Sequence, residues 1–208
     1  FRMYGVAAIA VGLFFLAALL WSVVSNGYTA FWQTSINLDV NFAESVIDPN
    51  GERATDPNKL LTANYPKLAT EALVAKLGVD PENRKLVREV GGLISNGVRT
   101  QLRDMVVSDP AIIGTTRNVW VLASGDVDSA VKGQVNLEVD ESRRKVSDQQ
   151  LTWIRTMEAD GVLEQRFNTG LFTRGASSRP ETAGMGVAIV GSLYMMMIVL
   201  LLALPIGV

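Results

Sequence analysis

The sequence predicts a membrane protein in which two transmembrane α-helices flank an extracytoplasmic α+β domain. No Asp, Glu, Lys or Arg occurs in residues 3–38 or in residues 182–208 of the 208-residue chain. Residues 39–181 hold all 21 acidic residues and all but one of the 19 basic residues, which is typical of an ordinary, slightly acidic water-soluble domain. Within that middle part, alternating patterns favour strands and three-to-four-residue patterns favour helices.

The composition excludes several kinds of chemistry. The chain contains no cysteine and no histidine, so it has no disulfide framework, no thiolate or imidazole metal site and no Ser-His-Asp triad. A formal net charge of −2 gives no reason to expect a nucleic-acid partner, and no glycine-rich loop of the ATP-binding type is present. We therefore expect no catalytic residues, no bound metal and no cofactor.

Residues 4–26 are expected to form the first transmembrane helix. At about 1.5 Å per residue, the uncharged residues 4–24 are long enough to cross about 30 Å of hydrocarbon. A cleaved signal peptide is the alternative, but its apolar core is usually shorter, about 7 to 15 residues. Aromatic residues at the two ends are placed as in an interfacial belt: Tyr4 on one side, and Trp21, Tyr28, Phe31 and Trp32 on the other.

A second transmembrane helix is expected within residues 182–208, where the chain stays apolar to its last residue. We expect the chain to be a fragment of a longer membrane protein. Small residues recur on one face of this segment, and small side chains let helices approach closely in lipid. We predict that this face packs against another helix and that the first segment offers a weaker matching face. The residues concerned are Gly184, Ala188, Gly191 and Ser192 in the second segment, and Ala8 and Gly12 in the first.

The distribution of basic residues predicts the orientation. Arg2 is the only basic residue before Arg53, which favours a cytoplasmic amino terminus. Arg174 and Arg179 argue mildly the other way, but long loops cross the membrane largely regardless of their charge. In a bacterium, we expect the chain in the inner membrane and its middle domain, residues 27–181, in the periplasm.

Patterning within the middle domain predicts both strands and helices. Strands are expected at residues 36–42, 119–122 and 135–139, with a hairpin formed by residues 162–167 and 171–173. Helices are expected at residues 66–77, after Asp126, and from a Ser147/Gln150 capping box to Gly161. One long helix is expected at residues 81–105, with Asp80 as its N-cap residue and Gly91-Gly92 weakening it.

Two charged clusters in the middle domain are candidate binding sites. Asp126 and Asp128 have the opening spacing of a calcium loop, but the required Gly and the later Glu ligand are missing. We expect these carboxylates to cap a helix and face solvent. The basic run 143–145 follows Asp140-Glu141 and is likewise expected to form a solvated face.

Four blocks of the chain resemble PstA-type permeases of phosphate ABC transporters, in the form that carries an extra domain before the permease core. The blocks are residues 2–40, 109–133, 147–175 and 180–208. The last block, PETAGMGVAIVGSLYMMMIVLLLALPIGV, resembles the opening of the permease core, and the blocks within the middle domain resemble the phosphate branch. The resemblance implies a fragment of a polytopic α-helical permease, acting as a membrane subunit of an ATP-driven phosphate importer.

The resemblance also implies partners rather than an active site. These are a second homologous permease subunit, a dimer of a cytoplasmic ATPase, a periplasmic phosphate-binding protein and the lipid bilayer. ATP hydrolysis would belong to the separate ATPase, and the loop that docks on it would lie beyond Val208. No phosphate-contacting residue can be carried over, so the substrate-binding residues stay unknown.

Two alternatives come from other classes of protein. A two-helix membrane sensor with a periplasmic ligand-binding domain has the same order of segments. Residues after the second helix of such a sensor usually become charged, whereas residues 204–208 stay apolar. A membrane-anchored hydrolase is the third hypothesis, and it depends only on the presence of a soluble domain.

Overall fold

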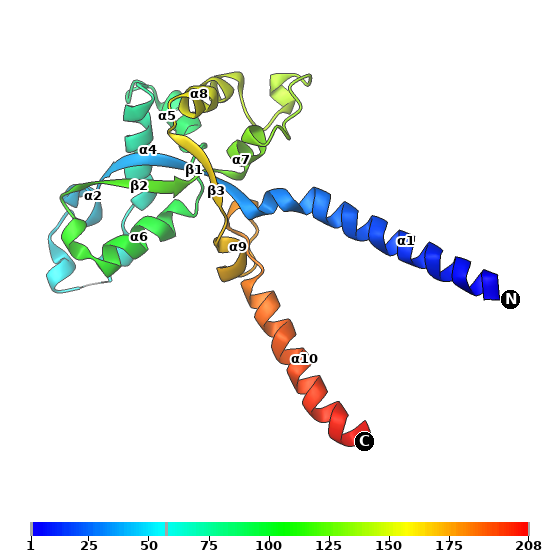
Figure 1. Ribbon diagram of the computed structural model, residues 1–208. Helices are drawn as coiled ribbons and strands as arrows, with labels where there is room; N and C mark the ends of the chain where they lie inside the picture. The colour runs from blue at the N-terminus through cyan, green and yellow to red at the C-terminus, as the bar shows by residue number, and fades with distance from the viewer. Residues whose placement is uncertain (1, 57, 208) are drawn as a thin grey trace.

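Two long helices project from a small domain in the computed structural model, which describes residues 2–56 and 58–207 (Figure 1). Helix α1 spans Arg2–Gly27 and helix α10 spans Gly186–Gly207. Both are long and apolar enough to cross a membrane, and the most apolar 18-residue window of each is not buried against the rest of the protein. These features confirm two long apolar helices with a domain between them.

A three-stranded antiparallel sheet forms the centre of the domain. Strand β1 (Trp32–Asn41) lies between β2 (Thr116–Leu122) and β3 (Leu163–Phe167). The strand expected at residues 36–42 is confirmed, but it begins earlier, directly after the short 3-10 helix η1 (Tyr28–Phe31) that continues α1. The first long helix therefore runs almost without interruption into the central strand.

Alternating burial along β1 determines which face of the sheet is covered. Ile36, Leu38 and Val40 are fully buried beneath helix α4 (Tyr65–Lys76), which packs on this strand. The opposite face is polar, and the Asn118 side-chain amide there donates to Asp39 at 2.8 Å. One apolar and one polar face are typical of an antiparallel sheet that faces water on one side.

The remaining helices are short, and several of them contribute buried residues to the core. They are α2 (Glu44–Ile47), η2 (Glu52–Ala54), α3 (Lys59–Thr62), α5 (Arg84–Gly91), α6 (Val98–Ser108), η3 (Pro110–Ile112), α7 (Gly125–Val131), η4 (Glu141–Arg143), α8 (Asp148–Ala159), α9 (Gly170–Thr173) and η5 (Pro180–Thr182). Tyr65 is a fully buried member of this core, and its hydroxyl donates to the Leu60 carbonyl at 2.6 Å. Burial raises the pKa of Tyr65 above its ordinary value of 10.0.

Several local predictions are confirmed. Helix α4 lies within one residue of the expected range at each end. The capping box is present at the start of α8, where the Ser147 hydroxyl and the Gln150 side chain each bond the other's backbone amide. Gly161 follows this helix with a φ of 67°, a left-handed conformation that glycine adopts without steric cost.

The prediction of one long helix over residues 81–105 is wrong. The structure contains α5 and α6 instead, separated by the segment 92–97. Two consecutive glycines weaken a helix by about 1 kcal/mol each, and Ile94 forms a bridge with Ala123 at the end of β2. The start also differs, because Asn83 rather than Asp80 is the N-cap residue and accepts from the Leu86 amide at 3.2 Å.

Two predicted strands are also absent from the part of the chain that the structure describes. Residues 135–139 form turns, and Leu137 is 51% exposed, so the alternation there has no buried face to support a strand. Residues 171–173 belong to α9 rather than to a hairpin. Strand β3 pairs with β1 instead of with the following segment, and the Asn168 side chain turns the chain by accepting from the Leu171 amide.

Candidate functional site

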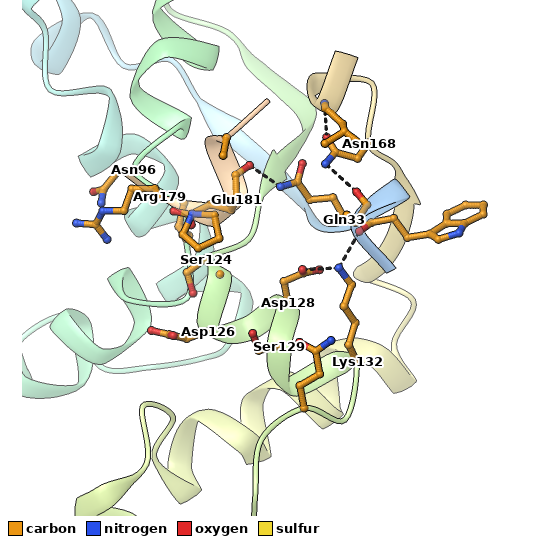
Figure 2. Close-up of a pocket in the computed structure, with 18 of the residues that line it drawn as sticks. Gln33, Asn96, Ser124, Asp126, Asp128, Ser129, Lys132, Asn168, Arg179 and Glu181 are labelled. Carbon is orange, nitrogen blue, oxygen red and sulfur yellow. Dashed lines mark hydrogen bonds and ion pairs between the residues drawn. The ribbon is translucent and has the colours of Figure 1, made fainter. Parts of the chain in front are cut away.

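A cleft of about 750 Å³ lies where the end of α1 and the start of α10 meet the domain. We call it the junctional cleft. Its walls come from the start of β1, the turn after α5, helix α7 and the linker between α9 and α10. Figure 2 shows polar side chains from all four segments turned toward one another. Segments from both ends of the chain and from its middle therefore meet at one site.

Asp128 connects helix α7 to the first residues of β1. Its Oδ1 accepts hydrogen bonds from the Thr34 amide at 2.9 Å and from the Thr34 hydroxyl at 2.7 Å. Its Oδ2 accepts from Lys132 Nζ at 2.6 Å, and Lys132 also donates to the Trp32 carbonyl at 2.8 Å. The Asp128 and Lys132 side chains are only 19% and 10% exposed, so salt screens this ion pair weakly.

Glu181 connects the linker before α10 to the same strand. Its backbone carbonyl accepts hydrogen bonds from the Gln33 side-chain amide and, at 3.2 Å, from Arg174 Nη1. Its carboxylate accepts from the Ser95 hydroxyl at 3.1 Å, and the residue is only 6% exposed. Since a buried carboxylate without hydrogen bonds is costly, the Ser95 contact helps to hold this linker in place. Figure 2 shows the Gln33 side chain reaching Glu181.

Asn168 joins the end of β3 to the segment that follows α1. Its backbone amide donates to the Phe31 carbonyl at 2.8 Å, and its side-chain amide donates to the Ala30 carbonyl at 3.1 Å. Its Oδ1 accepts from the Leu171 amide at 3.1 Å, in the first turn of α9. One side chain thus positions η1, β3 and α9 together.

Helix α10 begins against the short helix α9. The Met185 amide donates to the Leu171 carbonyl at 2.7 Å, and the Gly186 amide donates to the Arg174 carbonyl at 3.0 Å. Helix α10 therefore starts from a fixed point on the domain rather than from a free tether.

Two glycines make this close approach possible. A Cβ atom at Gly184 would lie 2.5 Å from the Gly170 carbonyl oxygen, and one at Gly186 would overlap the Phe172 carbonyl. Glycine is the residue that leaves room when backbones come this close. Gly184 precedes the first residue of α10 by two positions, so it packs on α9 and does not share the predicted small-residue face of the helix.

Several polar side chains of the junctional cleft connect separate segments of the chain. Three acidic and three basic side chains line it, so it offers no net charge to an ion. Ser124 uses its hydroxyl to accept from the Val127 amide and caps α7. Within residues 2–56 and 58–207, no group of three or more carboxylates could hold a metal ion. The hydrogen bonds of Asp128, Glu181 and Asn168 hold η1, the start of β1, helix α7 and the linker before α10 together.

A family model described as a domain of unknown function, DUF3333, matches residues 1–141. The chain belongs to the DUF3333 family. No curated protein and no solved structure matches it. The match includes α1, β1, β2 and α7, but it stops before β3, although β3 pairs with β1 in the same sheet. In this DUF3333 protein, the folded domain therefore continues beyond the matched residues.

The remaining residues predicted to pack helices lie on the two long helices of the DUF3333 protein. Ala188, Gly191 and Ser192 are exposed on α10, and Ala8 and Gly12 are exposed on α1. Nothing in the described part of the chain lies within 4 Å of a Cβ placed at Gly12 or Gly191, and the two helices diverge (Figure 1). The structure does not bring the two faces together, so their packing against other helices stays a prediction.

The expectations for the two charged clusters are corrected in part. Asp126 is 51% exposed, as expected, but Asp128 is mostly buried and binds β1 instead of facing solvent. The run 143–145 is exposed at both ends, whereas the Arg144 side chain is only 9% exposed and pairs with Asp148 at 2.7 Å. This pair lies at the start of α8.

Sequence reasoning missed most residues of the junction. The four-residue spacing of Asp128 and Lys132 is a local signal for an ion pair on a helix, so the sequence could have predicted this ion pair. Gln33 and Glu181 are 148 positions apart, and neither lies in a pattern that marks it. Their contact depends on the fold of the whole domain.

We expect Ser95→Ala to lower the free energy of unfolding of the domain by about 2 kcal/mol, because a hydrogen bond to a buried carboxylate is worth about 1.5–3 kcal/mol. A double-mutant cycle with Glu181→Ala isolates the side-chain contact, since the Gln33 and Arg174 bonds go to the Glu181 backbone carbonyl. Urea unfolding of the whole chain in micelles would measure the free energy of unfolding of each variant and hence the coupling energy. A coupling energy near zero would show that this contact does not stabilise the junction.

Proposed function

We propose that this DUF3333 chain is the amino-terminal part of a membrane permease subunit of an ATP-driven phosphate importer. The observation that carries the proposal is the segment 180–208. It leads from an ordered linker into the uncharged helix α10, and its sequence resembles the opening of a permease core. The first helix and the domain would then form an addition before that core.

The proposal extends to location and partners. In a bacterium, the amino terminus would be cytoplasmic, and the domain would project into the periplasm from the inner membrane. A second permease subunit, a cytoplasmic ATPase dimer and a periplasmic phosphate-binding protein would complete the importer. The absence of charged residues from residues 3–27 of α1 and from α10 supports placing both helices in lipid, because charged side chains at the bilayer centre are costly.

The geometry of the junction supports a specific role for the domain. Hydrogen bonds fasten η1, which continues α1, and the start of α10 to the domain, through Asn168 on one side and the backbone of α9 and Arg174 on the other. A domain held in this way would shape the periplasmic entrance of the permease or contact the docked binding protein. A freely tethered domain could do neither with a defined geometry.

Transport measurements test the proposed activity. Cells that lack the protein should lose ATP-dependent uptake of labelled phosphate, and expression of the full-length protein should restore it. Sulfate uptake serves as the matched control and should not change. Unchanged phosphate uptake would contradict the proposal, and a changed response to an external ligand without changed uptake would favour a sensor.

A deletion tests the role of the domain separately. Gln33 and Glu181 are in contact, so residues 34–180 can be replaced by a short Gly-Ser linker without pulling the ends of the two helices apart. We expect phosphate uptake and the affinity for the binding protein to fall. If both stay unchanged while the shortened protein is still inserted, the domain has no role at the entrance.

A further inference from the structure

Four aromatic rings form a continuous row at the junction. The ring centroids of Phe31 and Phe172 are 6.1 Å apart, and those of Phe172 and Phe167 are 6.3 Å apart. Trp32 follows at 6.1 Å from Phe167, its partner in the β1–β3 register. We call these four residues the aromatic rim. Phe31 ends η1 and Trp32 begins β1, directly after the first long helix, whereas Phe167 and Phe172 come from β3 and α9, far away in the sequence.

The rim is exposed although aromatic side chains ordinarily contribute to a core. Phe31, Trp32, Phe167 and Phe172 are 41%, 48%, 54% and 45% exposed. Contiguous exposed apolar surface marks an interaction site in a folded protein. Stacking among the rings keeps them in place, so the surface is formed before any partner covers it.

The position of the rim indicates what covers it. Phe31 is the last residue of the first membrane-compatible stretch, and Phe172 lies in α9, whose carbonyls bind the amides at the start of α10. The rim thus extends from the end of one long helix toward the start of the other, on the side of the domain from which both helices leave (Figure 1). It is continuous with the two apolar surfaces that a bilayer would cover.

We infer that the aromatic rim inserts into the lipid–water interface, so that the end of β3 and helix α9 form a third contact with the bilayer. Aromatic rings are favoured at the headgroup level, where an apolar body and a wet edge are both accommodated. The domain then lies directly on the membrane and does not swing on its two helices. The inference rests on the part of the proposed function that places α1 and α10 across a bilayer.

Spin labels on single cysteines test the inference, since the chain has no native cysteine. Phe167→Cys and Phe172→Cys place the label on the rim, and both sites are about half exposed, so the core is undisturbed. Leu137→Cys is the matched control, because Leu137 is a 51% exposed apolar residue in the segment between α7 and α8, which lies at the other end of the domain from α9 (Figure 1). Leu193→Cys reports on α10 itself. Each variant of the whole chain is placed in nanodiscs of phosphatidylcholine and phosphatidylglycerol.

For each spin label, we would measure the rate of collision with oxygen, which concentrates in lipid, and the rate of collision with a water-soluble nickel chelate. The ratio of the two rates reports whether the label lies in lipid or in water. We expect a several-fold higher oxygen-to-nickel ratio at positions 167 and 172 than at position 137, and a still higher ratio at position 193. If the ratios at positions 167 and 172 equal the ratio at position 137 while position 193 lies in lipid, the inference about the rim is overturned and the membrane placement of α10 is not. Low accessibility of the rim to both reagents would also overturn it, because protein would then cover the rim. A nickel-accessible label at position 193 would instead contradict the membrane placement itself.

Discussion

Asp128→Ala is expected to lower the free energy of unfolding of the domain by about 3 kcal/mol, since removing one partner of a largely buried ion pair costs about 3–5 kcal/mol and partial exposure reduces this. The substitution removes the acceptor for the Thr34 amide and hydroxyl. It also leaves the Lys132 ammonium, 10% exposed, with only the Trp32 carbonyl. Urea unfolding of the whole chain in micelles, followed by tryptophan fluorescence, would measure the change.

Two further variants separate the contributions at this position. Asp128→Asn keeps an acceptor for Thr34 but loses the ion pair with Lys132, so we expect roughly half of the effect, about 1–2 kcal/mol. Asp126→Ala is the matched control on the same helix, because Asp126 is 51% exposed and surface substitutions usually change stability by less than about 0.5 kcal/mol. Equal effects at positions 126 and 128 would show that the connection between α7 and β1 is not what stabilises the junction.

Gly186→Ala is expected to detach the start of α10 from α9. The added Cβ atom would overlap the Phe172 carbonyl, and backbone atoms cannot move aside as a flexible side chain can. Overpacking of this kind costs about 1–3 kcal/mol. In hydrogen exchange, we expect the protection of the amides of Met185 and Gly186, which bind α9 carbonyls, to fall by about tenfold, equivalent to about 1.4 kcal/mol.

Gly191→Ala is the control for this experiment. Within the described residues, a Cβ atom at Gly191 meets nothing within 4 Å, so the amides at the junction should keep their protection. If Gly191 packs against another helix, as its small-residue face predicts, this substitution would change assembly in the membrane and leave the junction intact. Loss of protection in both variants would mean that the α9–α10 contact is not specific to Gly186.

Local patterns in the sequence predict much of the fold. The uncharged ends, the alternation along β1 and the capping box of α8 depend on residues close together in the chain, and all three features are present. The errors arise where tertiary contacts override a local pattern. Residues 92–97 leave the helical path because Ile94 pairs with Ala123, and residues 135–139 form no strand because they have no buried face.

The junction was less accessible to prediction because its contacts join distant segments. Thr34 and Asp128 are 94 positions apart and Gln33 and Glu181 are 148 positions apart, and single residues of common types leave no periodic signal. The aromatic rim illustrates the same limit. Phe31 and Trp32 are recognisable beside an apolar segment, but Phe167 and Phe172 join them only through the register of β3 and the position of α9.

We propose that both long apolar helices cross the membrane and place the domain outside the cytoplasm. Ser142→Cys introduces a thiol at an exposed site of the domain, and Met3→Cys introduces one near the amino terminus. In spheroplasts treated with a membrane-impermeant maleimide, we expect labelling at position 142 without lysis and labelling at position 3 only after lysis. Labelling at position 142 only after lysis would contradict the claim.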